Sequence, residues 1–267
     1  MRIFCTILLA LSLLPLQSFG WGRLGHRTIA EIAERHLTES AKERIMHYTG
    51  SVHLADISTW MDEVSGTEPY KYRLRGWHAS IANEKCKSPI SVREEYRKGR
   101  DGVTAVEQFQ QRLVQPERVK DSVVLVAIKC LVHIVGDIHC PLHVRYTDFK
   151  NGGDFHIQFY GKKTQFHAVW DAGVLQRGSG FGIKDYKKYA DRLDTYTDKQ
   201  IAKVTKGNIQ SWFEDAAKTV RPTIHDIKAG DVADKEWVES VLPMGEELVR
   251  KSAYRLAKTL NDIFGDK

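Results

Sequence analysis

The hydrophobic and polar positions along the chain follow a helical period over most of its length. Apolar side chains recur every three or four residues from Ile29 to Leu37, which predicts a first amphipathic helix. Thr38 or Ser40 is a typical cap for a second helix, and Gly50 is a typical stop. The chain therefore opens with two helices.

The middle of the chain contains one segment that is apolar on all sides. Residues 54–64 have the pattern of a short helix, whereas residues 76–100 have few periodic apolar positions and are predicted to form a loop. From about Glu117 to His139 apolar residues surround the helix, so we expect this segment to be the longest helix and to lie buried at the centre. Pro141 ends it.

The last third of the chain combines one hairpin with two long helices. In the middle of the segment 152–166 polar and apolar residues alternate, and the segment contains a Gly-Lys pair typical of a turn. Residues 208–226 and 234–264 are amphipathic, and Pro243 is a position where the second can bend. The pattern predicts an all-α fold with a small β-hairpin.

The first twenty residues differ from the rest. Arg2, the apolar stretch 3–16 and the small residues near 18–20 are typical of a cleavable secretory signal. A membrane span needs about 20 apolar residues, so we expect residues 1–20 to be removed and the protein to be exported, to the periplasm or the medium, without a membrane anchor. Residues 21–267 contain no linker or repeat and are predicted to form a single domain, which we expect to be a monomer.

Charge and cysteines restrict the interpretation only a little. The net charge of +6 permits a polyanionic partner, but the lysines and arginines are spread thinly, as on an ordinary solvated surface. Signal removal leaves Cys86, Cys130 and Cys140, so at least one thiol is free. Cys130 and Cys140 would be roughly 15 Å apart on one helix, too far for a disulfide, while a bridge from Cys86 to either remains open.

Two pairs of histidine and aspartate carry the first chemical signal. His133 and Asp137 are four residues apart on the apolar helix, hence on one face, and His143 follows closely. His167 and Asp171 repeat this spacing. A lone buried histidine is usually a hydrogen-bonded core residue, but a buried carboxylate without a partner is costly, and imidazole and carboxylate are the nitrogen and oxygen ligands of zinc. The pattern predicts a metal site.

The new N-terminus supplies a further ligand set. Signal cleavage would expose Trp21, whose α-amino group has a pKa of about 7.7 to 8.0 and can lose its proton to zinc near neutral pH. The amine and carbonyl of Trp21 can chelate one ion, and His26 can complete the site.

In these motifs the chain resembles the zinc-dependent single-strand-specific nucleases of the S1/P1 type, which are related to bacterial zinc phospholipase C. The resemblance covers nearly the whole of residues 21–267 and rests on an N-terminal "WGRLGH", "STWMDEV", "WHAS", "HIVGDIHCPLH", a glycine pair before the hairpin and "HAVWDAGVL". It implies a multi-helix phospholipase C/nuclease-like fold.

The resemblance also implies three Zn²⁺ ions. The implied ligands are Asp62, His78, His133 and Asp137 for one ion, the amine and carbonyl of Trp21 with His26 and Asp137 for its neighbour, and His143, His167 and Asp171 for the third. Asp137 would bridge two ions, and Asp62 is the best candidate to orient the attacking water. His139 matches no ligand of the family, and neither do the surface or packing histidines His36, His47, His53, His156 and His225.

The implied reaction is hydrolysis of phosphodiester bonds in single-stranded DNA and RNA to products with 5′ phosphates, with 3′-nucleotides as further substrates. A zinc phospholipase C is the nearest rival, but its last ligand resembles Glu where this chain has Asp171. An exported zinc-binding protein without catalysis is a rival of another class.

The sequence departs from the family at positions that the resemblance implies for substrate binding. Ala79 and Ile81 stand where members tend to have an aromatic residue and an Asp or Asn, Ser65 stands where a basic residue is common, and Asp154 replaces an Asn after the glycine pair. Ala79 and Asp154 are therefore the substrate-binding positions at which base preference is in doubt. Three tryptophans beside ligands are expected to wall the site, although each could stack a base: Trp60, Trp77 and Trp170.

Overall fold

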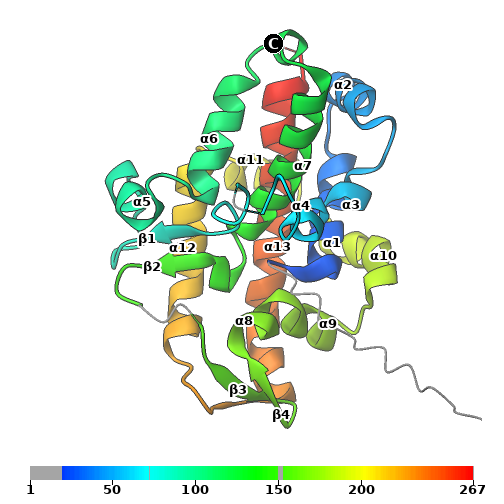
Figure 1. Cartoon of the computed structure of the whole chain (residues 1–267). Coiled ribbons are helices and arrows are strands. Elements are labelled where there is room, and N and C mark those ends of the chain that lie inside the picture. Colours follow the sequence, from blue (N-terminus) through cyan, green and yellow to red (C-terminus); the bar gives the residue numbers. More distant parts are fainter. Residues whose placement is uncertain (1–19, 72, 150–152, 267) are drawn as a thin grey trace, which may run out of the picture.

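The computed structural model describes residues 20–71, 73–149 and 153–266, so all of the predicted signal except Gly20 lies outside it (Figure 1). The described chain is mainly helical, which confirms the all-α prediction. Its helices are α1 (Gly22–Arg35), α2 (Glu39–Thr49), α3 (Leu54–Ile57), α4 (Trp60–Val64), α5 (Ile90–Arg97), α6 (Gly102–Arg112), α7 (Asp121–Asp137), α8 (Phe166–Ala168), α9 (Val174–Ser179), α10 (Tyr186–Leu193), α11 (Asp198–Val204), α12 (Ile209–His225) and α13 (Lys235–Phe264).

Short helical turns and strands connect these helices. The turns are η1 (Pro116–Arg118), η2 (Pro141–His143), η3 (Val169–Gly173) and η4 (Ile183–Asp185), and the strands are β1 (Ser80–Ala82), β2 (Val144–Tyr146), β3 (His156–Phe159), β4 (Lys162–Gln165) and β5 (Val232–Ala233).

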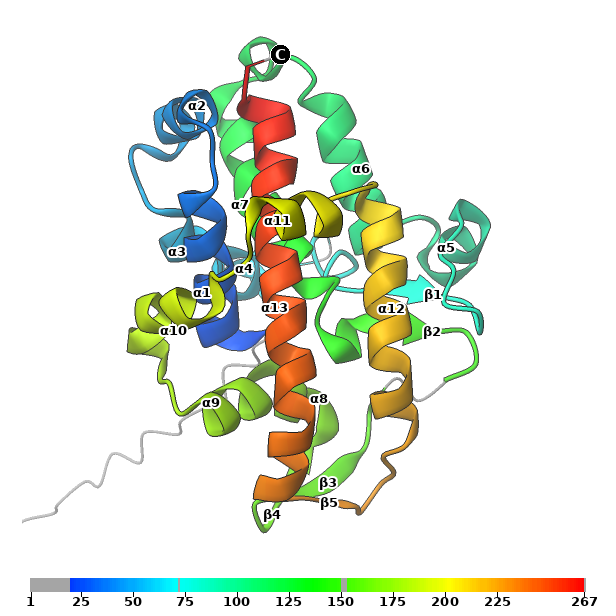
Figure 2. The same cartoon turned by 180° about the vertical axis from the view of Figure 1, so that it is seen from behind.

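Two helices form the centre of the molecule. The 30-residue α13 runs along its whole length in Figures 1 and 2 and packs against α1, α2, α7 and α9. As predicted, α7 is buried, and every residue from Cys130 to its end at Asp137 is inaccessible to solvent or nearly so. The burial of apolar surface around α7 and α13 holds the fold together.

The predicted limits of the second helix are confirmed by its caps, whereas the first helix begins earlier than predicted, at Gly22, and ends at Arg35 instead of Leu37. The Thr38 hydroxyl accepts a hydrogen bond from the Ala41 amide at the start of α2, and Gly50 adopts a left-handed conformation (φ 67°) at its end. The helix predicted over 54–64 is divided into α3 and α4 by a turn at 58–59.

Other predicted elements were wrong. The central helix begins at Asp121, because Pro116 starts the separate turn η1, and α13 rather than α7 is the longest helix. The segment 76–100 is not a loop throughout: β1 pairs in parallel with β2 across a long stretch of sequence, and α5 follows. A pairing of distant strands leaves no periodic signal in either one.

The predicted hairpin is formed by β3 and β4, which pair antiparallel, while β5 adds a parallel edge that the pattern did not predict. Its turn lies at Tyr160 and Gly161, which both have positive φ (49° and 74°), one residue before the predicted Gly-Lys pair. Positive φ at both central positions is the requirement of a tight type I′ hairpin turn.

Within the described chain, Cys86, Cys130 and Cys140 are buried free thiols, so the bridge left open for Cys86 is not formed. Burial raises the pKa of the Cys130 thiol to about 12. None of the helices that the structure describes is long and apolar enough to cross a membrane.

Candidate metal centre

The predicted ligands come from six parts of the chain and lie together at the C-terminal end of α7. Trp21 and His26 lie at the start of α1, Asp62 on α4, His78 just before β1, His133 and Asp137 on the last turn of α7, His143 on η2, and His167 and Asp171 on α8 and η3. Because α7 packs against α1 and α4, and η2 packs against η3, segments far apart in sequence face one another.

Asp137 is the centre of this cluster. Its carboxylate oxygens lie 3.1 Å from His26 Nε2, 2.8 Å from His78 Nδ1 and 3.1 Å from His133 Nε2. Asp62 closes the group, with Oδ1 3.4 Å from His133 Nε2. One carboxylate thus faces the imidazoles of three separate chain segments, with Oδ1 toward His26 and Oδ2 toward His78 and His133.

The other three predicted ligands form an adjoining group. His167 Nε2 lies 3.0 Å from His143 Nε2 and 3.4 Å from Asp171 Oδ1. His143 Nδ1 lies 3.7 Å from the carboxylate of Asp137, so the two groups are in contact. Most of these side chains are buried, and Asp62 and His167 are the most exposed, at 11% and 14%. The cluster therefore opens to solvent beside Asp62 and His167.

Backbone carbonyls orient the imidazoles. His133 Nδ1 donates to the carbonyl of Ser58 at 2.7 Å, and His143 Nδ1 donates to the carbonyl of His78. Trp21 Nε1 donates to the carbonyl of Gly136 at 3.0 Å, one residue before Asp137. A donated Nδ1 proton leaves Nε2 of the same ring with its lone pair directed into the cluster, as a metal ligand requires.

Although burial opposes both shifts, the carboxylates of Asp137 and Asp62 raise the pKa of His133 well above its usual value, and His133 lowers the pKa of Asp137 well below its own. Burial, together with the carboxylates of Asp137 and Asp62, raises the pKa of Asp171 well above its usual value. Burial also lowers the pKa of His143 to about 4 and that of His167 to about 2, so both imidazoles are neutral at pH 7. Neutral imidazoles next to crowded carboxylates are the donors that a divalent cation stabilises.

Unsatisfied polar atoms support the same fit. Oδ1 of Asp137 and Oδ1 of Asp171 are buried and accept no hydrogen bond from the part of the chain that the structure describes. His26 Nε2 and Asp137 Oδ1 are close, yet they are not oriented as donor and acceptor. Zinc bonds of about 2.1 Å in a tetrahedron place neighbouring ligand atoms about 3.4 Å apart, and most of the separations given above lie near this value. The donor set fits zinc.

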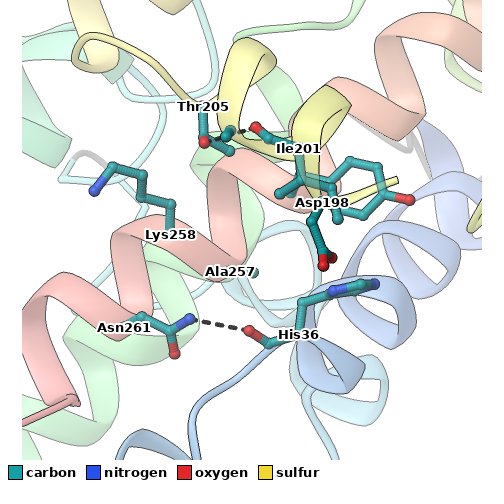
Figure 3. A pocket seen from close by; sticks show the side chains of 9 residues that line it. His36, Asp198, Ile201, Thr205, Ala257, Lys258 and Asn261 are labelled. Carbon is teal, nitrogen blue, oxygen red and sulfur yellow. Dashed lines mark hydrogen bonds between the residues drawn. The ribbon is translucent and has the colours of Figure 1, made fainter. Parts of the chain in front are cut away.

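Two hollows elsewhere hold none of these ligands. One of about 280 Å³ lies between α11, α13 and the residues after α1, where the Asn261 amide donates to the carbonyl of His36 (Figure 3). The other, of about 560 Å³, lies between α11, α12 and α13. Among the described residues, the groups of three or more potential ligands that lie close enough to share an ion all belong to the Asp137 cluster and none lines these hollows.

Comparison with known proteins agrees with this site. A family model described as S1/P1 Nuclease matches residues 21–265. The chain belongs to the S1/P1 nuclease family. It is 29% identical to Nuclease S1 of Aspergillus oryzae over 92% of both chains, and 27% identical to Nuclease P1 of Penicillium citrinum over 92% of this chain and 99% of that one. Endonuclease 2 of Arabidopsis thaliana is 26% identical over 92% of this chain and 91% of its own.

Because it belongs to the S1/P1 nuclease family, the protein is a nuclease, which hydrolyses phosphodiester bonds. The family match begins at Trp21, the residue that the predicted signal cleavage would expose. Among the described residues, Cys140 is a further potential ligand: its thiol lies in a group with His143 and Asp171, with ligand atoms within 4.8 Å of one another. Cys140 stands directly before Pro141 at the predicted helix end, where its spacing to the histidines did not indicate a ligand.

The two predicted substrate-binding positions and the three tryptophans beside the ligands differ in burial. Ala79 is buried and Asp154 is exposed, just before β3. Trp170 is in the core against Trp237, whereas the half-buried Trp60 packs on Tyr70 and the half-buried Trp77 on Phe109.

His139 and the other histidines stay outside the cluster's contacts described above. His139 is fully buried, where its Nε2 accepts a hydrogen bond from Arg255. His36 pairs with Asp194, and His225 packs on Phe149. The exposed ones are His47, His53 and His156.

Replacing Cys140 with serine is expected to leave the zinc content unchanged, whereas His167→Ala should remove about one ion. The reason is that His167 Nε2 lies within 3.4 Å of both partners of the adjoining group, while burial raises the pKa of the Cys140 thiol well above its usual value. Zinc measured by atomic emission on both variants checks this. Loss of zinc from Cys140→Ser with retention in His167→Ala would reverse the assignment.

Proposed function

We propose that the protein is an exported zinc-dependent endonuclease that hydrolyses single-stranded DNA and RNA to products with 5′ phosphates and also removes phosphate from 3′-nucleotides. The observation that carries the proposal is the convergence of the predicted ligands on Asp137. The proposal includes removal of residues 1–20, a single domain over residues 21–267 and a monomeric state.

Three zinc ions would be held by Asp62, His78, His133 and Asp137, by Trp21, His26 and Asp137, and by His143, His167 and Asp171. Bound together, such ions polarise a phosphate ester, activate water and stabilise a leaving oxygen. Asp137 is fully buried and acts by holding the imidazoles in place. Asp62 is partly exposed at the opening, where its carboxylate can accept a hydrogen bond from the attacking water and so orient it.

Preference for single strands follows from the burial of the cluster. A phosphate reaches side chains that are mostly buried only if the backbone on both sides of it can bend inward and its bases can unstack. A duplex must open locally first, which costs free energy that a single strand does not have to supply.

The substrate class can be tested directly with protein that begins at Trp21. We expect hydrolysis of single-stranded DNA, single-stranded RNA and a 3′-mononucleotide, and no hydrolysis of phosphatidylcholine in an emulsion. The cleaved nucleic acids should carry 5′ phosphates. Hydrolysis of the phospholipid alone would overturn the proposal in favour of a phospholipase C. Full zinc loading without any hydrolysis would favour a zinc-binding protein.

The enzyme is expected to discriminate little among bases, because Ala79 and Ile81 are small or aliphatic and both are buried. Neither can stack on a base or form a hydrogen bond with its edge. The measurement is the rate of cleavage of the four homopolymers under one condition. Rates that differ by more than about a hundredfold, roughly 2.7 kcal/mol in activation free energy, would show that another part of the chain forms a specific base pocket.

A further inference from the structure

A basic segment borders the opening of the metal centre and takes no part in the chemistry described above. Residues 69–77, called here the rim segment, lie between α4 and His78. Trp77 directly precedes the ligand His78, and near the other end Tyr70 packs against Trp60, two residues before the ligand Asp62. Figure 1 shows this stretch, in cyan, crossing the front of the molecule between α4 and β1. Apart from residue 72, it lies within the described chain.

The rim segment presents cations at its surface. Three basic side chains of the segment are exposed: Lys71, Arg73 and Arg75. The acidic residue nearest to them in the sequence is Glu68. The turn after α5 adds Lys98 and Arg100, which are exposed as well. This turn touches the rim segment, since a Cβ placed on Gly76 would lie 2.6 Å from the carbonyl oxygen of Arg100.

Packing holds the backbone of the rim segment in place. Leu74 is 2% exposed and anchors the middle of the segment in the core. Tyr70 packs edge-on against Trp60, with ring centres 5.0 Å apart, and Trp77 packs against Phe109. The amide of Leu74 donates to the carbonyl of Tyr70, and that of Trp77 to the carbonyl of Leu74. On both sides of residue 72, the described backbone that carries these cations is thus held in place by packing.

From this placement we propose that the rim segment, with Lys98 and Arg100, binds the phosphates of the nucleic-acid strand on one side of the scissile bond. The inference rests on the proposed function. Exposed cations next to an opening attract a polyanion and release its counterions on contact, without selecting any base. A 3′-mononucleotide has no neighbouring phosphate, so its hydrolysis does not need this surface.

The test compares the triple variant Lys71→Gln, Arg73→Gln, Arg75→Gln with the unsubstituted protein, both beginning at Trp21. The substrates are a single-stranded oligothymidylate and a 3′-mononucleotide. We expect KM for the oligonucleotide to rise about tenfold at low salt. The dependence of log(kcat/KM) on log salt should become less steep by up to about 2, at roughly 0.7 for each phosphate that the variant no longer neutralises. KM and kcat for the mononucleotide should stay within about twofold.

Two controls separate charge from structure and position. The triple variant Lys199→Gln, Lys203→Gln, Lys206→Gln removes the same charge from exposed positions on and beside α11, which lies on the opposite face (Figure 2). It should leave the salt dependence unchanged. The double variant Arg73→Lys, Arg75→Lys keeps the charge and should behave as the unsubstituted protein does.

An unchanged salt dependence in the rim variant, or an equal change in the α11 variant, would overturn the inference. If mononucleotide hydrolysis also falls, the single variant Arg73→Gln decides, because this side chain is exposed: a shift of about 0.7 in the salt slope supports the inference and no shift overturns it. Failure of the unsubstituted protein to cleave the oligonucleotide at all would instead overturn the proposed function.

Discussion

Replacing Asp137 with alanine is expected to lower the turnover of single-stranded DNA by at least about a thousandfold, roughly 4 kcal/mol in activation free energy. Zinc content should fall from three ions to about one. The carboxylate lies 2.8 to 3.1 Å from His26, His78 and His133, so its removal takes a ligand away from two of the proposed ions at once. Turnover and zinc content should be measured on the same preparation.

A matched control is Asp226→Ala, which removes an exposed carboxylate at the end of α12 and should change neither quantity. The variant His143→Ala should lose about one ion, because only one proposed site includes that imidazole. If Asp137→Ala kept three ions and more than about a tenth of the turnover, Asp137 would not bridge two metals.

Protein that retains one residue before Trp21 is expected to bind about one zinc ion fewer than protein that begins at Trp21, and to cleave single-stranded DNA at least about a hundredfold more slowly, roughly 2.7 kcal/mol. An added Met moves the free amine by about 3.8 Å and turns the nitrogen of Trp21 into an amide. The structure adds a second reason. A Cβ placed on Gly20 would lie 1.8 Å from Asp137 Oδ1 and 2.7 Å from His26 Nε2, so the residue before Trp21 fills the place between these two ligands.

The comparison uses protein processed on export and protein that begins Met-Trp21, each loaded with zinc under one condition. A short extension after Lys267 serves as control and should leave both zinc content and rate unchanged. Equal zinc and equal rates in the exported and Met-Trp21 forms would remove the N-terminal amine from the site.

The parts of the site that could be predicted from the residues alone are those with a local signal. His133 and Asp137 lie one turn apart on an apolar helix, and His167 and Asp171 repeat the spacing, so a metal was expected from these pairs. Asp62 and His78 have no such signal, because only the packing of α4 and the segment before β1 against α7 brings them near Asp137. Their assignment came from the family resemblance.

Other features leave no mark on side-chain patterns. The groups that orient His133 and His143 are the backbone carbonyls of Ser58 and His78, and any residue type supplies a carbonyl. In contrast, α11 was missed although its start carries a local signal: the hydroxyl of Thr197 and the side chain of Gln200 form a capping box. Non-local packing therefore limited the prediction of the site, and attention to caps would have improved that of the fold.

The most direct test of the zinc cluster is an anomalous difference map at the zinc edge from crystals of protein that begins at Trp21. The account predicts three peaks, each within about 2.0 to 2.2 Å of the nitrogen and oxygen atoms of one proposed ligand set, with Asp137 in contact with two of them. A single peak, or peaks that leave the Trp21 amine or Asp137 without a metal, would contradict it.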